Sequence, residues 1–429
     1  MAGSKRISSG FAWLAVIAIL ITAVPFVGTS GARAQEPVTL KFWTTNEDNF
    51  APMVEQFVAE HPGITIEAQY VGSYDDMSAR IQTAIVGNEL PDVAQVGQRY
   101  GIPQMVDSGV VIPVDEYLSE DDVADIHAGL WSRYTYREGR WAIPFQSSTP
   151  GLWFNATMMR QAGLDPANPP QTWEDVVAAG KAMTKDTNGD GQVDQWGFGT
   201  CDDIPWYQRA MVLQGGGTLV DAEGKVSVNS LESVEMLTWF KDAVHTHKIS
   251  PALAQQTARD DFSAGNYGML FCSTASRLSF QEDVGNTFEL GVAFLPEHKR
   301  RAVGVGGNAL IAVRTGDEAR ETAAKTFVQW MTDAERAVGI SLDSGYVPIR
   351  QSALADPRIV ELATTDPLVG TIYDQLQYVA DSSISPADSL IWDGFLNGVE
   401  TVQTDPNADP QAVLDTLQGE IDDYMSTYE

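Results

Sequence analysis

The chain has 429 residues, of which 58 are Asp or Glu and 27 are Lys or Arg, so its formal net charge is −31. A polyanion of this strength is repelled by nucleic acid and by anionic lipid surfaces, which excludes both as partners. The length allows two or three hydrophobic cores. The two cysteines, Cys201 and Cys272, allow one disulfide, but their spacing in the sequence does not show whether they meet.

The first residues are typical of an export signal. Lys5 and Arg6 precede an apolar stretch over residues 11–27, and residues 32–34 read Ala-Arg-Ala, with small residues where a signal peptidase cuts. A membrane anchor is the alternative, because the apolar stretch approaches the ~18 residues of a spanning helix. We predict a signal peptide over residues 1–34. Its removal takes away three basic residues and no acid, so the charge of −31 becomes −34 in the mature protein, which we expect to be periplasmic.

Strands and helices alternate at the start of the mature chain. Apolar and polar residues alternate in a way that predicts strands over residues 38–43, 64–70 and 92–96, and helical periodicity predicts helices over residues 53–58 and 74–87. Strands that alternate with helices form a parallel sheet with helices on its faces. The first part of the chain is therefore expected to be an α/β unit.

The same alternation returns in the second half of the chain. Strands are predicted over residues 268–272, 290–295 and 309–313, and an apolar stripe from Ala324 to Met331 predicts a helix. No internal repeat and no flexible linker separates the two regions. We therefore predict an α/β protein with two lobes joined by short crossings, which is the arrangement that a hinge needs.

The sequence lacks the motifs of a hydrolase or of a nucleotide-binding enzyme. It contains no Gly-x-Ser-x-Gly nucleophile elbow, no His-Glu-x-x-His zinc motif and no phosphate-binding loop. Asp202 and Asp203 are candidates for a glycan-acting lyase or glycosidase, but adjacent acids on a strand point in different directions and do not form an opposed pair. We expect a binding protein without catalytic residues, and a glycan-acting enzyme and an adhesin or scaffold are the alternatives.

Residues 186–194 resemble the first part of a calcium-binding loop. Side chains with oxygen atoms stand at positions 1, 3, 5 and 9 of this loop, namely Asp186, Asn188, Asp190 and Asp194. A glycine stands at position 6, as such loops require, but position 12 is also a glycine instead of the bidentate Glu. We expect either a weak structural calcium site or a polar turn, and no other cofactor.

A long ordered motif lies before the middle of the chain. It reads Trp-Ala-Ile-Pro-Phe-Gln-Ser-Ser-Thr-Pro-Gly-Leu-Trp-Phe-Asn over residues 141–155, followed by Ala-Gly-Leu-Asp-Pro over 162–166 and Pro-Gln-Thr-Trp-Glu-Asp over 170–175. Its order and spacing resemble the signature of the family 1 extracellular solute-binding proteins, the carbohydrate-type receptors of ABC importers, and most closely their glycerol-phosphate receptors. The likeness extends to Tyr-Val-Gly-Ser-Tyr over 70–74 and Gly-Tyr-Val-Pro-Ile over 345–349.

The resemblance implies two α/β lobes, each built from separate chain segments and joined by a hinge. The lobes are expected to close over a ligand in the cleft between them and to deliver it to the permease subunits. We predict a first lobe of residues 35–146 plus about 308–345, and a second lobe of residues 147–307 plus about 346–429. Such a receptor is expected to act as a monomer.

Candidate ligand-binding residues come both from the resemblance and from the chemistry of sugars. The resemblance assigns ligand contacts to Tyr74, Ser148, Gly307 and Tyr346, places Gln98 where glycerol-phosphate receptors have an acid, and places Trp206 in a region of indole rings. A sugar exposes hydroxyls around apolar C–H faces, so its receptor needs aromatic rings beside amides, hydroxyls and carboxylates. Further candidates of these kinds at strand ends and turns are Trp43, Asn46, Glu47, Ser147, Asn308 and Trp392. The alternatives are a place in the core for Trp43 and a solvated loop for Gln98.

The charge of the ligand is inferred from one segment. Residues 381–392 contain no Lys or Arg, whereas the resemblance places there the Arg that binds a phosphate. A phosphate dianion buried in an acidic protein needs a compensating cation, since an unpaired buried charge costs several kcal/mol. We therefore expect a sugar, a polyol or an oligosaccharide as the ligand, with glycerol 3-phosphate or a glycerophosphodiester as the alternative.

Overall fold

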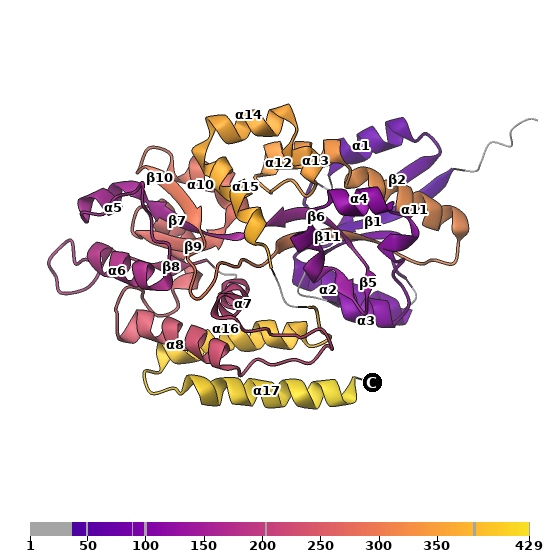
Figure 1. Cartoon of the computed structure of the whole chain (residues 1–429). Coiled ribbons are helices and arrows are strands. Elements are labelled where there is room, and N and C mark those ends of the chain that lie inside the picture. Colours follow the sequence, from indigo (N-terminus) through magenta and orange to yellow (C-terminus); the bar gives the residue numbers. More distant parts are fainter. Residues whose placement is uncertain are drawn as a thin grey trace, which may run out of the picture. The chain divides into compact units, whose positions relative to one another are not determined.

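Two β-sheets, each covered by helices, make up most of the protein (Figure 1). The computed structural model describes residues 37–48, 50–87, 89–97, 101–201, 204–380 and 383–428. Within residues 37–429 the chain forms a single compact unit. The predicted signal peptide, residues 1–34, lies outside the described residues. Among the described helices, none combines the length and the apolar character that crossing a membrane would need.

The first sheet has five strands, in the order β2 (Ile64–Tyr70), β1 (Val38–Thr44), β3 (Val93–Gly97), β11 (Gly306–Ala312) and β6 (Ile143–Ser148). Strand β1 runs parallel to β2 and β3, whereas β11 runs antiparallel to both β3 and β6. The three strands predicted at the start of the mature chain are confirmed. The prediction of a parallel sheet is wrong for β11, which lies between β3 and β6 and runs antiparallel to both.

Helices cover both faces of this sheet. Side chains of α1 (Ala51–Glu60) and α11 (Glu318–Met331) form one hydrophobic cluster with alternate residues of the strands, such as Phe42 and Leu310. Side chains of α2 (Tyr74–Gly87) and α3 (Ile102–Asp107) form another cluster with the intervening residues, such as Trp43 and Ile311. Because successive strand residues point to opposite faces, both faces are apolar and both need a helical cover.

The second sheet has four strands, in the order β10 (Leu290–Phe294), β7 (Pro150–Asn155), β9 (Met269–Ser273) and β8 (Gly199–Thr200). Strand β7 is antiparallel to its neighbours β10 and β9, and β8 is parallel to β9. The strands predicted over 268–272 and 290–295 are confirmed by β9 and β10. The side chains of this sheet belong to the largest hydrophobic cluster, which includes Trp153, Phe198 and Phe271.

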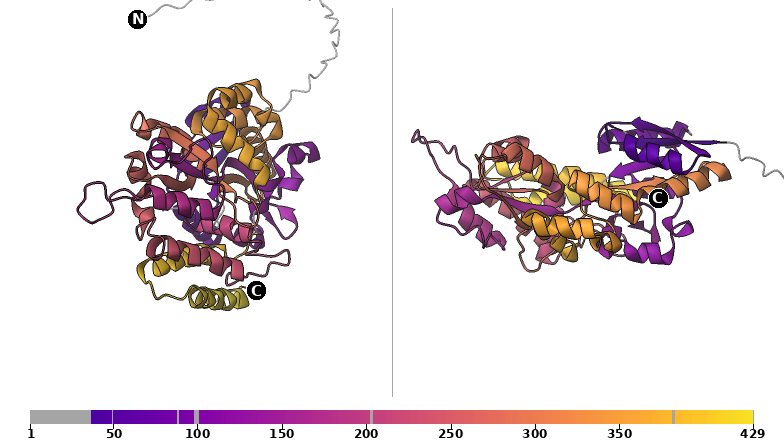
Figure 2. Two further views of the ribbon diagram at one scale, coloured as in Figure 1. Left: turned by 60° about the vertical axis from the view of Figure 1, so that its left-hand side comes forward. Right: turned by 90° about the horizontal axis from the view of Figure 1, so that it is seen from above.

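The remaining helices complete the two lobes. Helix α8 (Leu231–His245) contacts α7 (Ile204–Gly215), α16 (Asp388–Thr404) and α17 (Pro410–Thr427). The last two helices are drawn in yellow in Figures 1 and 2. The other elements are α4 (Glu120–Asp125), β4 (Thr135–Tyr136), β5 (Gly139–Arg140), α5 (Ala156–Gln161), α6 (Trp173–Met183), α9 (Ala258–Ser263), α10 (Arg277–Val284), α12 (Ala334–Ser344), α13 (Gln351–Leu354), α14 (Pro357–Thr365), α15 (Pro367–Asp374), and the 3-10 helices η1 (Val114–Glu116), η2 (Ala128–Arg133), η3 (Ala254–Gln256), η4 (Thr274–Ser276) and η5 (Gln375–Tyr378).

The chain passes from the first sheet to the second between β6 and β7, and it returns to the first sheet between β10 and β11. Strand β6 of the first sheet ends at Ser148 and β7 of the second sheet begins at Pro150, so Thr149 alone separates them. The chain returns after β10 and enters the first sheet at Gly306, where β11 pairs with the end of β6. The predicted lobe boundaries at 146/147 and 307/308 fall inside β6 and β11, and the precise extent of each lobe stays a prediction.

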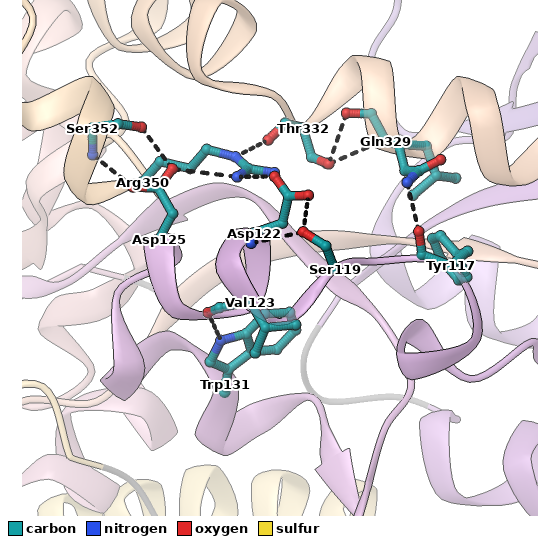
Figure 3. Close-up of polar contacts among 11 residues, drawn as sticks. Tyr117, Ser119, Asp122, Val123, Asp125, Trp131, Gln329, Thr332, Arg350 and Ser352 are labelled. Atoms are coloured by element: carbon teal, nitrogen blue, oxygen red, sulfur yellow. Dashed lines mark hydrogen bonds and ion pairs between the residues drawn. The ribbon is translucent and has the colours of Figure 1, made fainter.

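A polar network fastens the start of α13 to α4 (Figure 3). The Arg350 side chain donates to the backbone oxygen of Thr332 at 2.7 Å and to the carboxylates of Asp122 at 3.0 Å and Asp125 at 3.3 Å. Ser352 donates to Asp125 through its backbone N–H at 2.8 Å and its hydroxyl at 2.6 Å. Residues 350–352 are therefore held against the segment that precedes β4.

This network predicts a loss of stability in acid. Hydrogen bonds from Ser119 and Arg350 lower the pKa of Asp122. Burial alone would raise the pKa of Asp125, but the hydrogen bonds from Ser352 and Arg350 outweigh burial, so the pKa of Asp125 is also lowered. A carboxyl with a lowered pKa in the folded state contributes stability above the unfolded-state value of about 3.9, and this contribution is lost as the pH falls through the lowered pKa. We expect the free energy of unfolding, measured with urea between pH 2.5 and 7, to fall less steeply below pH 4 for Asp122→Asn/Asp125→Asn than for the wild type.

The exposed Asp283 provides the control for this measurement. Its Asn variant should retain the wild-type dependence on pH. Equal slopes for the double variant and the wild type would contradict the prediction.

Candidate functional site

A cavity of about 610 Å³ lies where the chain crosses between the two sheets. It adjoins the carboxyl ends of the parallel strands β2 and β3, the place where open α/β sheets bind ligands. The residues that line it are Ser73, Tyr74, Asp75, Gly97, Ser148, Trp206, Arg259, Ser273, Ala275, Ser276, Ser279, Gly306, Gly307, Tyr346 and Trp392. Two other hollows, of about 930 and 900 Å³, lie away from these strand ends.

The structure brings six of the predicted ligand-binding residues together around this cavity. They are Tyr74, Ser148, Trp206, Gly307, Tyr346 and Trp392. They come from α2, β6, α7, β11, the turn after α12 and α16, so both sheets and the helices around them contribute. Their contact with a ligand stays a prediction, but their convergence makes this cavity the candidate site.

A chain of amides holds the phenol of Tyr74 in the cavity wall. The buried Asn308 donates from Nδ2 to the Tyr74 hydroxyl at 2.8 Å and to Oε1 of Gln146 at 3.0 Å. Gln146 in turn accepts a hydrogen bond from Gln95 at 3.2 Å. A Cβ on Gly97 would lie 2.8 Å from Cγ of Tyr74, so only glycine permits this position of the ring. Asn308, which the sequence predicts to bind the ligand, is not among the lining residues and supports Tyr74. Its contact with a ligand stays a prediction.

Two glycines allow the crossing strands to approach the Trp206 ring. A Cβ on Gly306 would lie 2.3 Å from Cζ2 of Trp206 and 2.6 Å from the Ser148 hydroxyl. Gly307 has a φ of 98°, and a Cβ there would lie 1.8 Å from the backbone oxygen of Gln146. The indole N–H of Trp206 has no hydrogen-bond partner among the described residues, although the side chain is only 6% exposed. The wall therefore contains a donor that its described neighbours do not satisfy.

Hydroxyl groups and one guanidinium also line the cavity from the second lobe. Ser273 ends β9, and Ser276 and Ser279 follow in η4 and α10. Arg259 comes from α9 and donates to the Ser276 hydroxyl at 2.9 Å. These residues were not predicted from the sequence, although the three serines directly follow a predicted strand and strand ends are where such sheets bind ligands. No comparable signal marks Arg259.

A disulfide lies directly behind this wall. Cys201, next to the end of β8, is bonded to Cys272 of β9, which answers the question that the sequence left open. Nη2 of Arg259 lies 3.3 Å from Sγ of Cys272. The disulfide thus joins the segment that leads into α7, where Trp206 stands, to the strand that presents Ser273.

Several other predicted residues do not line the cavity. Trp43 is 6% exposed and packs in a hydrophobic cluster, with the Arg80 guanidinium 4.1 Å from its ring, because its position in β1 directs it toward α2. Asn46 accepts a hydrogen bond from the backbone N–H of Asp48, and Glu47 is exposed. Ser147 is fully buried beneath the lining and bridges to Val347. Gln98, Asp202 and Asp203 lie outside the described residues.

The predicted calcium loop is organised by its own hydrogen bonds. Asp186 accepts from the backbone N–H groups of Gly189 and Gly191, both at 2.7 Å. Asp194 accepts from the backbone and the hydroxyl of Thr187 at 2.8 and 2.9 Å. Across the described ranges, no group of three or more His, Cys, Asp or Glu side chains is arranged to hold a metal ion. Calcium binding at Asp186, Asn188, Asp190 and Asp194 stays a prediction.

The close packing at Gly306 gives a test of the cavity wall. We expect Gly306→Ala to lower the free energy of unfolding by about 1–3 kcal/mol, the usual cost of overpacking, because the new methyl group would have to displace Trp206 or the crossing strand. Gly419 is the matched control, since a Cβ there meets nothing within 4 Å. Urea unfolding measures both variants, and an equal or higher stability of Gly306→Ala would contradict this packing.

Comparison with known proteins identifies the family. The sequence model for "Bacterial extracellular solute-binding protein" matches residues 43–337. The chain is 24% identical over 345 residues to the sn-glycerol-3-phosphate-binding periplasmic protein UgpB of Escherichia coli strain K12, a match that covers 75% of this chain and 76% of that protein.

Solved structures share the fold. The structure of UgpB from Mycobacterium tuberculosis in complex with glycerophosphocholine has a TM-score of 0.77 at 20% identity and covers 91% of this chain and 99% of its own. The cyclic α-maltosyl-1,6-maltose binding protein of Arthrobacter globiformis has a TM-score of 0.76 at 22% identity, with coverage of 89% and 97%. These likenesses confirm the predicted fold of two α/β lobes around a cleft. With more than half of its length matched, the chain belongs to the bacterial extracellular solute-binding protein family and is the solute-binding protein of an ABC importer.

Proposed function

We propose that the protein captures a sugar, a polyol or an oligosaccharide in the cavity between its lobes and delivers it to the permease subunits of the importer. The observation that carries this proposal is the composition of the cavity, where the rings of Tyr74, Trp206, Tyr346 and Trp392 stand among serine hydroxyls from both lobes. Aromatic faces complement the apolar C–H faces of a sugar, and hydroxyls and amides complement its rim.

The mechanism is closure of the lobes on the ligand. Ser73 and Tyr74 line the cavity from the first lobe and Ser276 lines it from the second, so one ligand that touches both walls links the lobes. Binding favours the closed form by the difference between the contacts that the ligand makes in the two forms. The indole N–H of Trp206 is a donor that a ligand hydroxyl would satisfy.

The protein is proposed to act without catalysis. The relatives described above are named as binding proteins, and glycoside hydrolysis needs two opposed carboxyl groups. Among the described residues that line the cavity, Asp75 is the only acid. We further propose a monomer that works in the periplasm after cleavage of its signal peptide and that has no nucleic-acid partner.

The experiment is a panel of sugars, polyols and oligosaccharides added to the purified mature protein. A ligand that binds the folded form raises the melting temperature by mass action, and lobe closure lowers the radius of gyration in small-angle scattering. We expect both changes with at least one compound and their loss in Trp206→Ala. Tyr70→Ala, an exposed ring outside the cavity lining, is the control. If no compound changes either quantity, the proposal is rejected.

A second candidate ligand class is glycerol 3-phosphate or a glycerophosphodiester. Residues 381–392 contain no cation to balance a phosphate, which favours a neutral ligand. The structure supplies a cation to the cavity from elsewhere, since Arg259 of α9 belongs to its lining. This class therefore belongs in the same panel.

We also propose that residues 186–194 form a weak calcium clip. Loops of this type in extracellular modules bind calcium with Kd values of about 10⁻⁴ to 10⁻³ M. We expect millimolar calcium to raise the melting temperature of the wild type and to leave that of Asp186→Ala/Asp190→Ala unchanged, with magnesium as the control ion. Equal melting curves with and without 10 mM calcium would exclude the clip.

A further inference from the structure

Arg259 is a guanidinium group in the cavity wall whose charge no described carboxylate balances. It is half-buried at the start of α9, and no described Asp or Glu lies within ion-pair distance of it. The buried Arg277 and Arg350, by contrast, each have a carboxylate partner. Arg277 pairs with Asp366 at 3.1 Å, and Arg350 pairs with Asp122 at 3.0 Å. In a chain of net charge −31, an arginine in a ligand cavity that has no acidic partner among the described residues needs an explanation.

The structure holds the Arg259 side chain in one place. Nη1 donates to the Ser276 hydroxyl at 2.9 Å, Nη2 contacts the Cys272 sulfur at 3.3 Å, and the guanidinium carbon lies 5.3 Å from the centre of the Phe280 ring. A guanidinium has five N–H donors, and these two contacts use two of them. Three donors therefore have no partner among the described residues, although the group is already positioned.

Three serines line the same cavity as this guanidinium, and one of them, Ser276, accepts a hydrogen bond from it. Ser273, Ser276 and Ser279 line the same wall of the cavity. A fixed guanidinium beside hydroxyl donors is suited to a planar carboxylate or a phosphate group, because it can donate two parallel, charge-assisted hydrogen bonds. Asp75 lines the cavity as well, from α2 of the first lobe. A carboxylate there accepts hydrogen bonds from ligand hydroxyls.

We infer that the ligand is a hydroxylated compound with one anionic group, and that Arg259 with its neighbouring serines binds this group on the second lobe. The inference rests on the proposed capture of a sugar- or polyol-type ligand and narrows it to acidic members of that class. The anion is a carboxylate or a phosphate ester, since the two share the chemistry that a guanidinium recognises.

Compounds that share one skeleton test this inference. Isothermal titration compares D-glucose, D-glucuronate and D-glucose 6-phosphate, and separately glycerol and sn-glycerol 3-phosphate, with inorganic phosphate as the probe for an anion without a skeleton. We expect an acidic compound to bind at least tenfold more tightly than its neutral counterpart. Its identity shows whether the anion is a carboxylate or a phosphate ester.

Variants assign the preference to Arg259. Arg259→Gln should weaken binding of the acidic compound at least tenfold and change that of the neutral counterpart less than twofold. Arg259→Lys, which keeps the charge but not the planar donors, should retain part of the preference. The control is Arg160→Gln, which removes the same charge from an exposed ion pair with Glu289 outside the cavity lining. If Arg259→Gln fails to fold, the test of the anion site is the preference for the acidic compound in the wild type and in Arg259→Lys.

The outcomes separate this inference from the proposed function. Equal binding of neutral and acidic compounds, or an equal loss for both in Arg259→Gln, overturns the anion site and leaves sugar or polyol capture standing. The equal loss is also the result expected if Arg259 only pairs with Asp75 when the lobes close. Tight binding of inorganic phosphate without any hydroxylated compound supports the anion site and rejects the proposed function. No binding by any compound rejects both.

Discussion

Replacement of Cys201 and Cys272 by serine is expected to lower the free energy of unfolding by about 4 kcal/mol. The two cysteines are 71 residues apart in the sequence, so their bond closes a long loop in the unfolded chain. A cross-link of this span removes much of the conformational entropy of the unfolded state, and the reduced chain recovers it. Urea unfolding of the oxidised wild type and of the double variant measures the difference.

Loss of the disulfide should also affect the position of the cavity wall, because the bond joins the segment before Trp206 to the strand that ends in Ser273. Wild-type protein unfolded in the presence of a reductant is the control and should match the double serine variant. A difference below 1 kcal/mol between the oxidised and reduced wild type would show that the bond contributes little to stability.

Replacement of Asp388 by alanine is expected to cost about 3–5 kcal/mol, the range for the loss of one partner of a buried ion pair. Asp388 begins α16 and lies 2.7 Å from Arg133 at the end of η2 and 3.6 Å from Arg209 of α7. All three side chains are buried. Without the carboxylate, Arg133 would keep its charge in a site that water does not reach. Thermal and urea unfolding measure the loss.

Two further variants separate charge from packing. Asp393→Ala removes an exposed carboxylate from the same helix and should change the stability by less than about 0.5 kcal/mol. The double variant Arg133→Met/Asp388→Leu removes both members of the 2.7 Å ion pair and should lose less stability than Asp388→Ala alone, since the buried Arg133 charge is removed together with its carboxylate. A double variant as unstable as Asp388→Ala would attribute the effect to shape.

The sequence predicted local structure and family well, and the reason is physical. Strands such as 38–43 and helices such as 74–87 follow from the spacing of apolar residues, which depends on near neighbours. The motif over residues 141–155 indicated the two-lobed receptor fold, which the structural comparisons confirm. It also indicated Ser148, which the structure places in the cavity lining.

The sequence alone did not determine which distant groups share the site. Asn308 and Tyr74 are 234 positions apart and meet only because β11 inserts between β3 and β6 in the first sheet. Arg259 lines the cavity because α9 packs beside β9. Trp43 does not line it, because its register in β1 directs the side chain into a hydrophobic cluster. Apolar periodicity specifies which face of a helix or strand is buried. The order in which the strands pair decides which other elements that face contacts, and this order is set by contacts across the whole chain.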